Sequence, residues 1–156
     1  MIAIDVASVP TDDGDLAELL TAYFKDLSLR YWEFEVSWEE FEAEIKPGVR
    51  FLLARRDGTA VGCCALQRNR ESGLEGIELK RMYVDPAARG TGVANALLEA
   101  AEKLARELGA PQIYLETGVR QPEARRVYER SGYTEIPTYP PWVGMELSVA
   151  YAKRLS

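Results

Sequence analysis

The 156-residue sequence contains no histidine. This absence excludes the Ser-His and Cys-His pairs of nucleophilic catalysis and most kinds of zinc site, so we expect no metal centre. Any acid–base chemistry must therefore be carried out by Glu, Asp, Tyr, Lys, Cys or water.

Cysteine is scarce as well, because the chain has only Cys63 and Cys64, which are adjacent. Neighbouring residues of a strand point to opposite faces, so this pair does not link distant parts of a fold. The pattern favours a reducing compartment and two small, buried strand residues. A nucleophilic or redox thiol is the alternative interpretation.

Long apolar runs are also missing, since none approaches the roughly 20 residues that a membrane span needs. The first residues, "MIAIDVASVP", lack the basic start and the long apolar middle of a signal peptide. We therefore expect a cytoplasmic protein with no membrane partner. The length suits one compact domain over residues 1–156.

The charges are distributed unevenly within a net charge of −6. Residues 1–48 hold 12 acidic and 3 basic side chains, whereas residues 49–156 hold 13 acidic and 16 basic ones. An acidic first third and a mildly basic remainder indicate two kinds of ligand environment on one domain. The sequence has no concentrated basic block, so we expect no nucleic-acid partner.

The hydrophobic periodicity predicts one mixed sheet with helices on both faces, in the order β-α-α-β-β-β-α-β-α-β-β. Because a helix separates the strands 77–84 and 112–117, we expect those two strands to be parallel. The predicted elements are a strand 2–9, a helix over apolar positions 16–27 capped by Asp12 or Asp13, a short helix that begins with the capping box "SWEE" at 37–40, a hairpin 49–68 that turns at Asp57-Gly58, a strand 77–84, a helix 93–108, a strand 112–117, a helix that begins at Pro122 and ends before Gly132, and strands 133–136 and 146–155.

The stretch "MYVDPAARGTGVANALL", residues 82–98, joins a strand to a helix through a glycine-rich loop. A dinucleotide fingerprint needs a third glycine where Asn95 stands, and a Walker loop needs Gly-Lys-Ser/Thr, which is absent. A ligand-free turn is the remaining plain alternative. The unpaired N–H groups and the dipole of a helix start, together with Gly90, Gly92 and Arg89, favour a cradle for pyrophosphate.

Two motifs carry a resemblance to a known family. "MYVDPAARGTGVANALLEAAEKLARELG" resembles the cofactor-binding motif of the GCN5-related N-acetyltransferases, and "QPEARRVYERSGY" resembles their second motif, Asn-x-x-Ala-x-x-Leu-Tyr-x-x-x-Gly-Phe. The element order is also similar over nearly the whole chain, and the finer pattern resembles a bacterial small-molecule branch. The resemblance implies an acyl-CoA N-acyltransferase fold with a splayed central pair of parallel strands, and acetyl-CoA as co-substrate.

The resemblance also implies a set of cofactor-binding residues. The strand end would lend backbone groups to the pantetheine arm, and an N–H of its bulge would steady the oxyanion. Gln121 replaces the family's asparagine, so its amide contact to the arm would be longer; Ala94 and Asn95 are two further departures. The implied residues are Met82, Tyr83 and Val84 for the arm and Arg89, Gly90, Thr91, Gly92, Val93 and Ala94 for the pyrophosphate.

For catalysis, Tyr128 matches the family's tyrosine that faces the thioester sulfur, and its phenol would protonate the leaving thiolate. Its alternative role is that of a core aromatic residue. Glu78, on the strand that leads to the splay, is the first candidate for the base; an ion pair with Lys80 or Arg81 is its alternative. Glu116 and Glu33 are further candidates for the base. A route through Cys64 lacks an activating base, which favours direct attack by the amine.

The acidic and aromatic residues 31–40 would attract a cationic small-molecule amine, although charges on a helix face are commonly just solvated. Tyr139 and Trp142 of "PTYPPWVG" would line the same pocket. A non-catalytic acyl-CoA sensor, a protein or peptide N-acetyltransferase and a homodimeric assembly stay open at this point.

Overall fold

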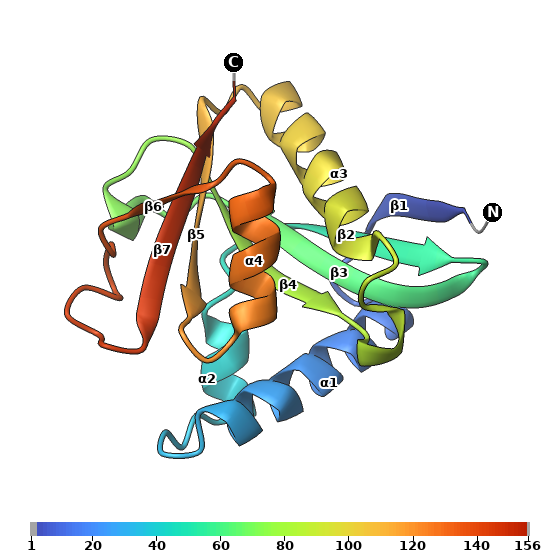
Figure 1. Cartoon of the computed structure of the whole chain (residues 1–156), viewed down its shortest axis with the longest axis horizontal. Coiled ribbons are helices and arrows are strands. Elements are labelled where there is room, and N and C mark those ends of the chain that lie inside the picture. Colours follow the sequence, from blue (N-terminus) through green and yellow to red (C-terminus); the bar gives the residue numbers. More distant parts are fainter. Residues whose placement is uncertain (1–2, 156) are drawn as a thin grey trace.

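The computed structural model describes residues 3–155 and has the predicted order of elements (Figure 1). Residue Ile2 of the first predicted strand lies outside the described residues. The bounds are β1 Ile4–Val9, α1 Gly14–Arg30, α2 Trp38–Ala43, β2 Arg50–Arg56, β3 Thr59–Gln67, β4 Ile77–Val84, α3 Val93–Glu107, β5 Gln112–Gly118, α4 Pro122–Arg130, β6 Thr134–Ile136 and β7 Ser148–Arg154, with single 3₁₀ turns at Arg70–Ser72 and Pro86–Ala88.

The local signals of the sequence act as expected. Asp13 caps α1 by accepting a hydrogen bond from the Leu16 N–H at 3.0 Å, and Ser37 caps α2 in the same way through the Glu40 N–H at 3.1 Å. Asp57 has a φ of 53°, so the predicted hairpin does turn through a left-handed pair of residues at Asp57-Gly58.

The seven strands form one sheet in the order β1-β2-β3-β4-β5-β7-β6. The pair β4 and β5 is parallel, as predicted, and the other neighbours are antiparallel. Helices α3 and α4 cover one face, while α1 and α2 cover the other (Figure 1). The fold is therefore the mixed α/β architecture that the sequence predicted.

The adjacent cysteines show how the strand alternation divides the core. Cys64 belongs to the cluster beneath α3 and α4, whereas Cys63 belongs to the cluster beneath α1. Both thiols are free and fully buried, and burial raises the pKa of Cys63 to about 12. The prediction of small, buried strand residues is confirmed, and no helix within residues 3–155 has the length and apolarity to cross a membrane.

Strand β4 leaves its parallel neighbour halfway along its length. Ile77, Glu78 and Leu79 pair with β5, and the rest of β4 does not. On its other side, the register with β3 shifts by one residue where Arg81 adopts a φ of 58°. This β-bulge bends the strand away from β5, and the gap between the two strands is where both cavities described below meet.

Candidate active site

A cavity of about 450 Å³ lies between the end of β4, the start of α3 and helix α4. It contains ten of the residues that the sequence predicted for cofactor binding and catalysis. They are Met82, Tyr83, Val84, Arg89, Gly90, Gly92, Val93, Ala94, Gln121 and Tyr128. Thr91 does not line this cavity, because its hydroxyl turns back and donates to the Ala88 carbonyl at 2.5 Å.

The loop before α3 leaves donors free at the rim of this cavity. Gly90 and Gly92 have φ angles of 78° and 94°, which side-chain-bearing residues rarely adopt, so the turn itself requires glycine. Gly92 is the N-cap of α3 and provides no side-chain cap. The first N–H groups of α3 therefore remain available to an anion.

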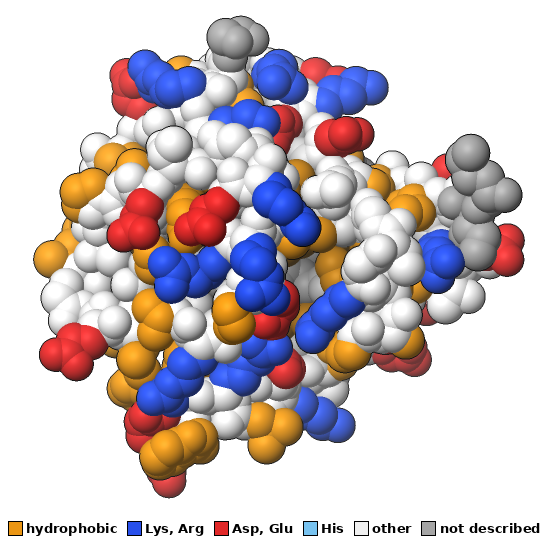
Figure 2. All heavy atoms as spheres, in the orientation of Figure 1, with side chains coloured by type: hydrophobic (Ala, Val, Ile, Leu, Met, Phe, Trp, Pro, Cys, Tyr) orange, Lys and Arg blue, Asp and Glu red, His pale blue; other side chains and the backbone are white. Residues whose placement is uncertain are grey.

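Two arginines that sequence reasoning missed also line the cavity. Arg126 and Arg130 lie one turn apart on α4 and join Arg89 around the same space. Figure 2 shows Lys and Arg side chains gathered over α4 and the neighbouring loops on this face. The four-residue spacing on an amphipathic helix was the available signal, and these cations offset the neutral Asn95 in the loop.

We expect the double variant Arg126→Gln/Arg130→Gln to raise the KM for acetyl-CoA roughly 5-fold while kcat changes little, because each arginine supplies charge-assisted hydrogen bonds to phosphate. Steady-state kinetics at two salt concentrations measure this change. Arg106→Gln, an exposed arginine of α3 that does not line the cavity, is the matched control. An unchanged KM would remove α4 from the phosphate site.

Tyr128 stands at the deep end of the first cavity, only 4 % exposed, with the rings of Tyr133 and Tyr151 at 5.8 and 6.0 Å. Its hydroxyl has no hydrogen-bond partner within residues 3–155. Burial raises the pKa of Tyr128 well above that of a free phenol, so the group stays protonated. It is thus a free proton donor as well as a core aromatic residue.

A second cavity of about 770 Å³ opens on the α1 and α2 side of the same gap and shares Tyr23 and Gln121 with the first. The Gln121 side-chain oxygen accepts hydrogen bonds from the Gly118 N–H at 3.2 Å and from the Tyr31 hydroxyl at 3.3 Å. The Tyr31 hydroxyl packs so closely on Gly118 that a Cβ there would lie 1.5 Å from it. Gln121 is therefore held between the two cavities.

Glu116 lines the second cavity directly beyond Leu115, the last residue of β5 that pairs with β4. Burial raises the pKa of Glu116 to about 7, although a hydrogen bond with Ser148 and the charge of Lys80 oppose the rise. A carboxyl group with a pKa near neutrality is suited to accept a proton at physiological pH.

Glu78, the first candidate for the base, lines neither cavity. Its side chain is 1 % exposed and accepts a hydrogen bond from the Tyr139 hydroxyl at 2.7 Å and one from the Gln67 amide at 3.4 Å. This contact raises the pKa of Tyr139 strongly, after the larger effect of burial. Glu78 thus has two neutral partners. The alternative of an ion pair with Lys80 or Arg81 is wrong, because both of these cations lie beside Glu44.

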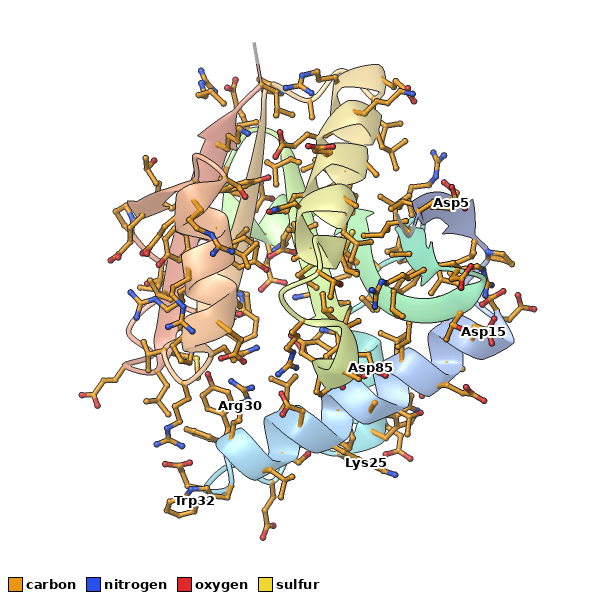
Figure 3. All side chains as sticks on the ribbon, turned by 45° about the vertical axis from the view of Figure 1, so that its right-hand side comes forward. Asp5, Asp15, Lys25, Arg30, Trp32 and Asp85 are labelled. Carbon is orange, nitrogen blue, oxygen red and sulfur yellow. The ribbon has the colours of Figure 1, made fainter. Side chains whose placement is uncertain are left out.

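Glu33, a further candidate for the base, lines the second cavity but is held in an ion pair. Arg120 binds Glu33 through two hydrogen bonds of 2.5 and 2.6 Å, which lower the pKa of Glu33 to about 2. A carboxylate held in this way is a poor base. Arg30 donates to the Arg120 carbonyl at 2.8 Å, and Figure 3 shows Arg30 pointing from the end of α1 toward the loop between β5 and α4. Trp32 lies at the outer edge and is 73 % exposed.

A splayed parallel strand pair, a glycine-rich anion loop at a helix start and two cavities that meet at the splay define an acyl-CoA N-acyltransferase. The chain belongs to the Acetyltransferase (GNAT) family, whose family model matches residues 15–133. It is therefore an acyltransferase.

Comparison with individual proteins agrees with this family. The chain is 41% identical to the IAA acetyltransferase of Azospirillum brasilense over 110 residues, which cover 70% of this chain and 71% of the relative. It is 30% identical to the aminoalkylphosphonate N-acetyltransferase of Salmonella typhimurium, with 86% and 88% of the two chains covered. A solved structure from Klebsiella pneumoniae, named as an acyl-CoA N-acyltransferase, is 29% identical and superimposes with a TM-score of 0.79 over 98% of both chains.

Proposed function

We propose that this protein transfers the acetyl group of acetyl-CoA to the primary amine of a small molecule. The observation that carries the proposal is the meeting of the two cavities at the gap between β4 and β5, where each shares Tyr23 and Gln121 with the other. One cavity suits a long phosphate-bearing donor, and the other suits a compact acceptor. Because one sheet carries both, we infer a single catalytic domain.

The residues of the first cavity fit acetyl-CoA, the co-substrate of the family. The free N–H groups of α3 and the cations Arg89, Arg126 and Arg130 suit phosphates. The part of β4 from Met82 to Val84 lacks strand partners on the β5 side, so its backbone groups are open to an amide-bearing arm. When bound, the co-substrate supplies an activated acetyl group as a thioester.

Glu116 is the proposed base, in place of Glu78, which is the first candidate from the sequence. An alkyl ammonium must lose a proton before its nitrogen can attack, and Glu116 is the carboxyl group with a near-neutral pKa that faces the acceptor cavity. Glu78 lies behind Tyr139, with both carboxylate oxygens engaged. We propose that it holds Tyr139 in place and does not contact the amine.

Tyr128 is the proposed acid. Its free, protonated hydroxyl donates to the sulfur as the bond from carbon to sulfur breaks. The protons balance: the ammonium gives one proton to Glu116, which releases it to water, and the nitrogen loses a second proton on forming the amide. The thiolate gains the Tyr128 proton, and the second proton from nitrogen restores the phenol through water. Cys64 takes no part in this scheme, because its thiol is fully buried and burial raises its pKa.

The acceptor class rests on two observations. The second cavity is closed on one side by aromatic residues and holds several charged groups, which suits a small polar molecule. The two named relatives act, by their names, on small molecules, IAA and aminoalkylphosphonate. We propose that a cationic amine is the acceptor, as the acidic first third of the chain predicted.

The test is release of free thiol from acetyl-CoA in the presence of a panel of small amines and of lysine-bearing peptides, with mass spectrometry of the products. We expect turnover with small amines. Turnover with peptides alone would reassign the protein to peptide acetylation, and saturable acetyl-CoA binding without any turnover would make it a sensor.

A further inference from the structure

The β-bulge of β4 brings two successive cations to one side of the sheet. Neighbouring strand residues normally face opposite ways, but Lys80 and Arg81 both reach Glu44, at 3.7 and 3.8 Å. The positive φ of Arg81 marks the extra residue that causes this arrangement. Both side chains line the acceptor cavity.

Arg81 is a buried cation with unused donors. It is 7 % exposed, its ring partner Phe41 lies 3.7 Å beneath the guanidinium, and one N–H donates to the Phe41 carbonyl at 2.5 Å. The Glu44 carboxylate at 3.8 Å is beyond hydrogen-bond distance. Over residues 3–155 the other guanidinium nitrogens make no hydrogen bond, and they are not among the fully buried atoms without a partner, so they stay accessible from the cavity that Arg81 lines.

Trp142 lines the same cavity beside Lys80. Its indole Nε1 is the one buried side-chain nitrogen or oxygen that has no hydrogen-bond partner in the described part of the chain. The Lys80 ammonium lies 5.6 Å from the centre of this indole ring, so the ring packs beside the cation in the cavity wall.

Glu33, Glu44, Glu116 and Glu146 all line this cavity, but among the described residues only Glu44 is ion-paired with Lys80 and Arg81. Arg120 and Glu33 neutralise each other through their paired hydrogen bonds. Glu44 is one carboxylate shared by two cations at distances too long for hydrogen bonds. Arg81 therefore has no hydrogen bond to a carboxylate, and its free donors can bind a further anion.

We propose that the acceptor is a zwitterion, a primary amine that also carries a carboxylate, with the carboxylate bound by Lys80 and Arg81. This inference rests on the proposed function and names its substrate class. The amine of the same molecule faces Glu116, and the anion is bound at the bulge. A simple cationic amine leaves the free donors of Arg81 without a partner and is a poorer acceptor.

The test compares matched acceptors that differ only in the anion, phenylalanine against phenylalaninamide and β-alanine against β-alaninamide, at saturating acetyl-CoA. We expect kcat/KM for the better anionic acceptor to exceed that of its amide at least ~10-fold, as charged hydrogen bonds of this kind provide. In Lys80→Gln and Arg81→Gln the ratio falls to about one, and Arg81→Lys recovers part of it.

Arg55→Gln is the control, because Arg55 pairs with Asp15 and lines neither cavity; it keeps the ratio of the native protein. If the variants of the buried Arg81 fail to fold, the ratio measured for Lys80→Gln provides the test. Equal rates within both pairs, a preference for the amides, or no reaction of any anionic acceptor overturns the inference. If the amides still release thiol, the proposed function stands. If neither the anionic acceptors nor their amides react and acetyl-CoA does not bind, the proposed function is wrong as well.

Discussion

Glu116→Gln is expected to lower kcat/KM for the amine about 100-fold, which is the size of a lost general base. In the native protein kcat/KM rises with pH through about 7, because Glu116 must lose its proton before it can accept one from the amine. In the variant this rise of kcat/KM is lost, and only the pH dependence that comes from the amine itself remains. A pH–rate profile from pH 5.5 to 9 measures both effects.

The same substitution is expected to stabilise the fold at alkaline pH. The pKa of Glu116 is raised from 4.5 to about 7, so its contribution to stability is present below pH 4.5 and is lost as the pH rises through about 7. Glutamine carries no such penalty, which predicts a gain of about 3 kcal/mol in the free energy of unfolding at pH 8. Denaturant unfolding at pH 5 and 8 tests this prediction.

Glu78→Gln is the comparison that separates the two carboxyl groups. The amide has one acceptor oxygen instead of two, so it cannot accept from both Tyr139 and Gln67, and the variant is expected to be less stable while the rise of kcat/KM with pH persists. If instead Glu78→Gln abolishes this rise and Glu116→Gln preserves it, the base is Glu78, as the sequence first favoured.

The contrast between these two residues marks how far sequence reasoning reached. The hydrophobic periodicity predicted the fold, and the glycine-rich loop predicted most of the residues that line the first cavity, because both patterns depend on residues close together in the chain. The choice of base depends on which carboxyl group faces the splay. Tyr139, which is 61 residues from Glu78 in the sequence, donates a hydrogen bond to Glu78 and covers it. No pattern of neighbouring residues predicts such a contact.

The ion pairs lead to the same conclusion. Glu33 looked like a free acid for an amine, yet it is bound by Arg120, which is 87 residues away in the sequence. Lys80 and Arg81 are the alternative ion-pair partners of Glu78 in the sequence analysis, but both lie beside Glu44 instead. A positive φ at an arginine is rarely signalled by sequence, because glycine and asparagine are the residues that favour it.

Tyr128→Phe is expected to lower kcat about 100-fold and to leave the Kd for acetyl-CoA within 2-fold. The ring still fills its place beside Tyr133 and Tyr151, so the packing that shapes the first cavity is retained. The hydroxyl makes no hydrogen bond within residues 3–155, so its removal leaves no partner unsatisfied. Thiol release measures kcat, and calorimetry measures the affinity.

Tyr133→Phe is the matched control, because it removes a hydroxyl from the neighbouring ring that donates to Glu102 at 3.1 Å outside both cavities. It is expected to lower stability and to leave kcat unchanged. An acyl donor with a less basic leaving thiol is expected to recover part of the rate in Tyr128→Phe, since a thiolate that leaves readily needs less help from an acid. A kcat that Tyr128→Phe leaves intact, or a defect that the better leaving group does not reduce, would show that the phenol does not protonate the thiolate and acts there through packing alone.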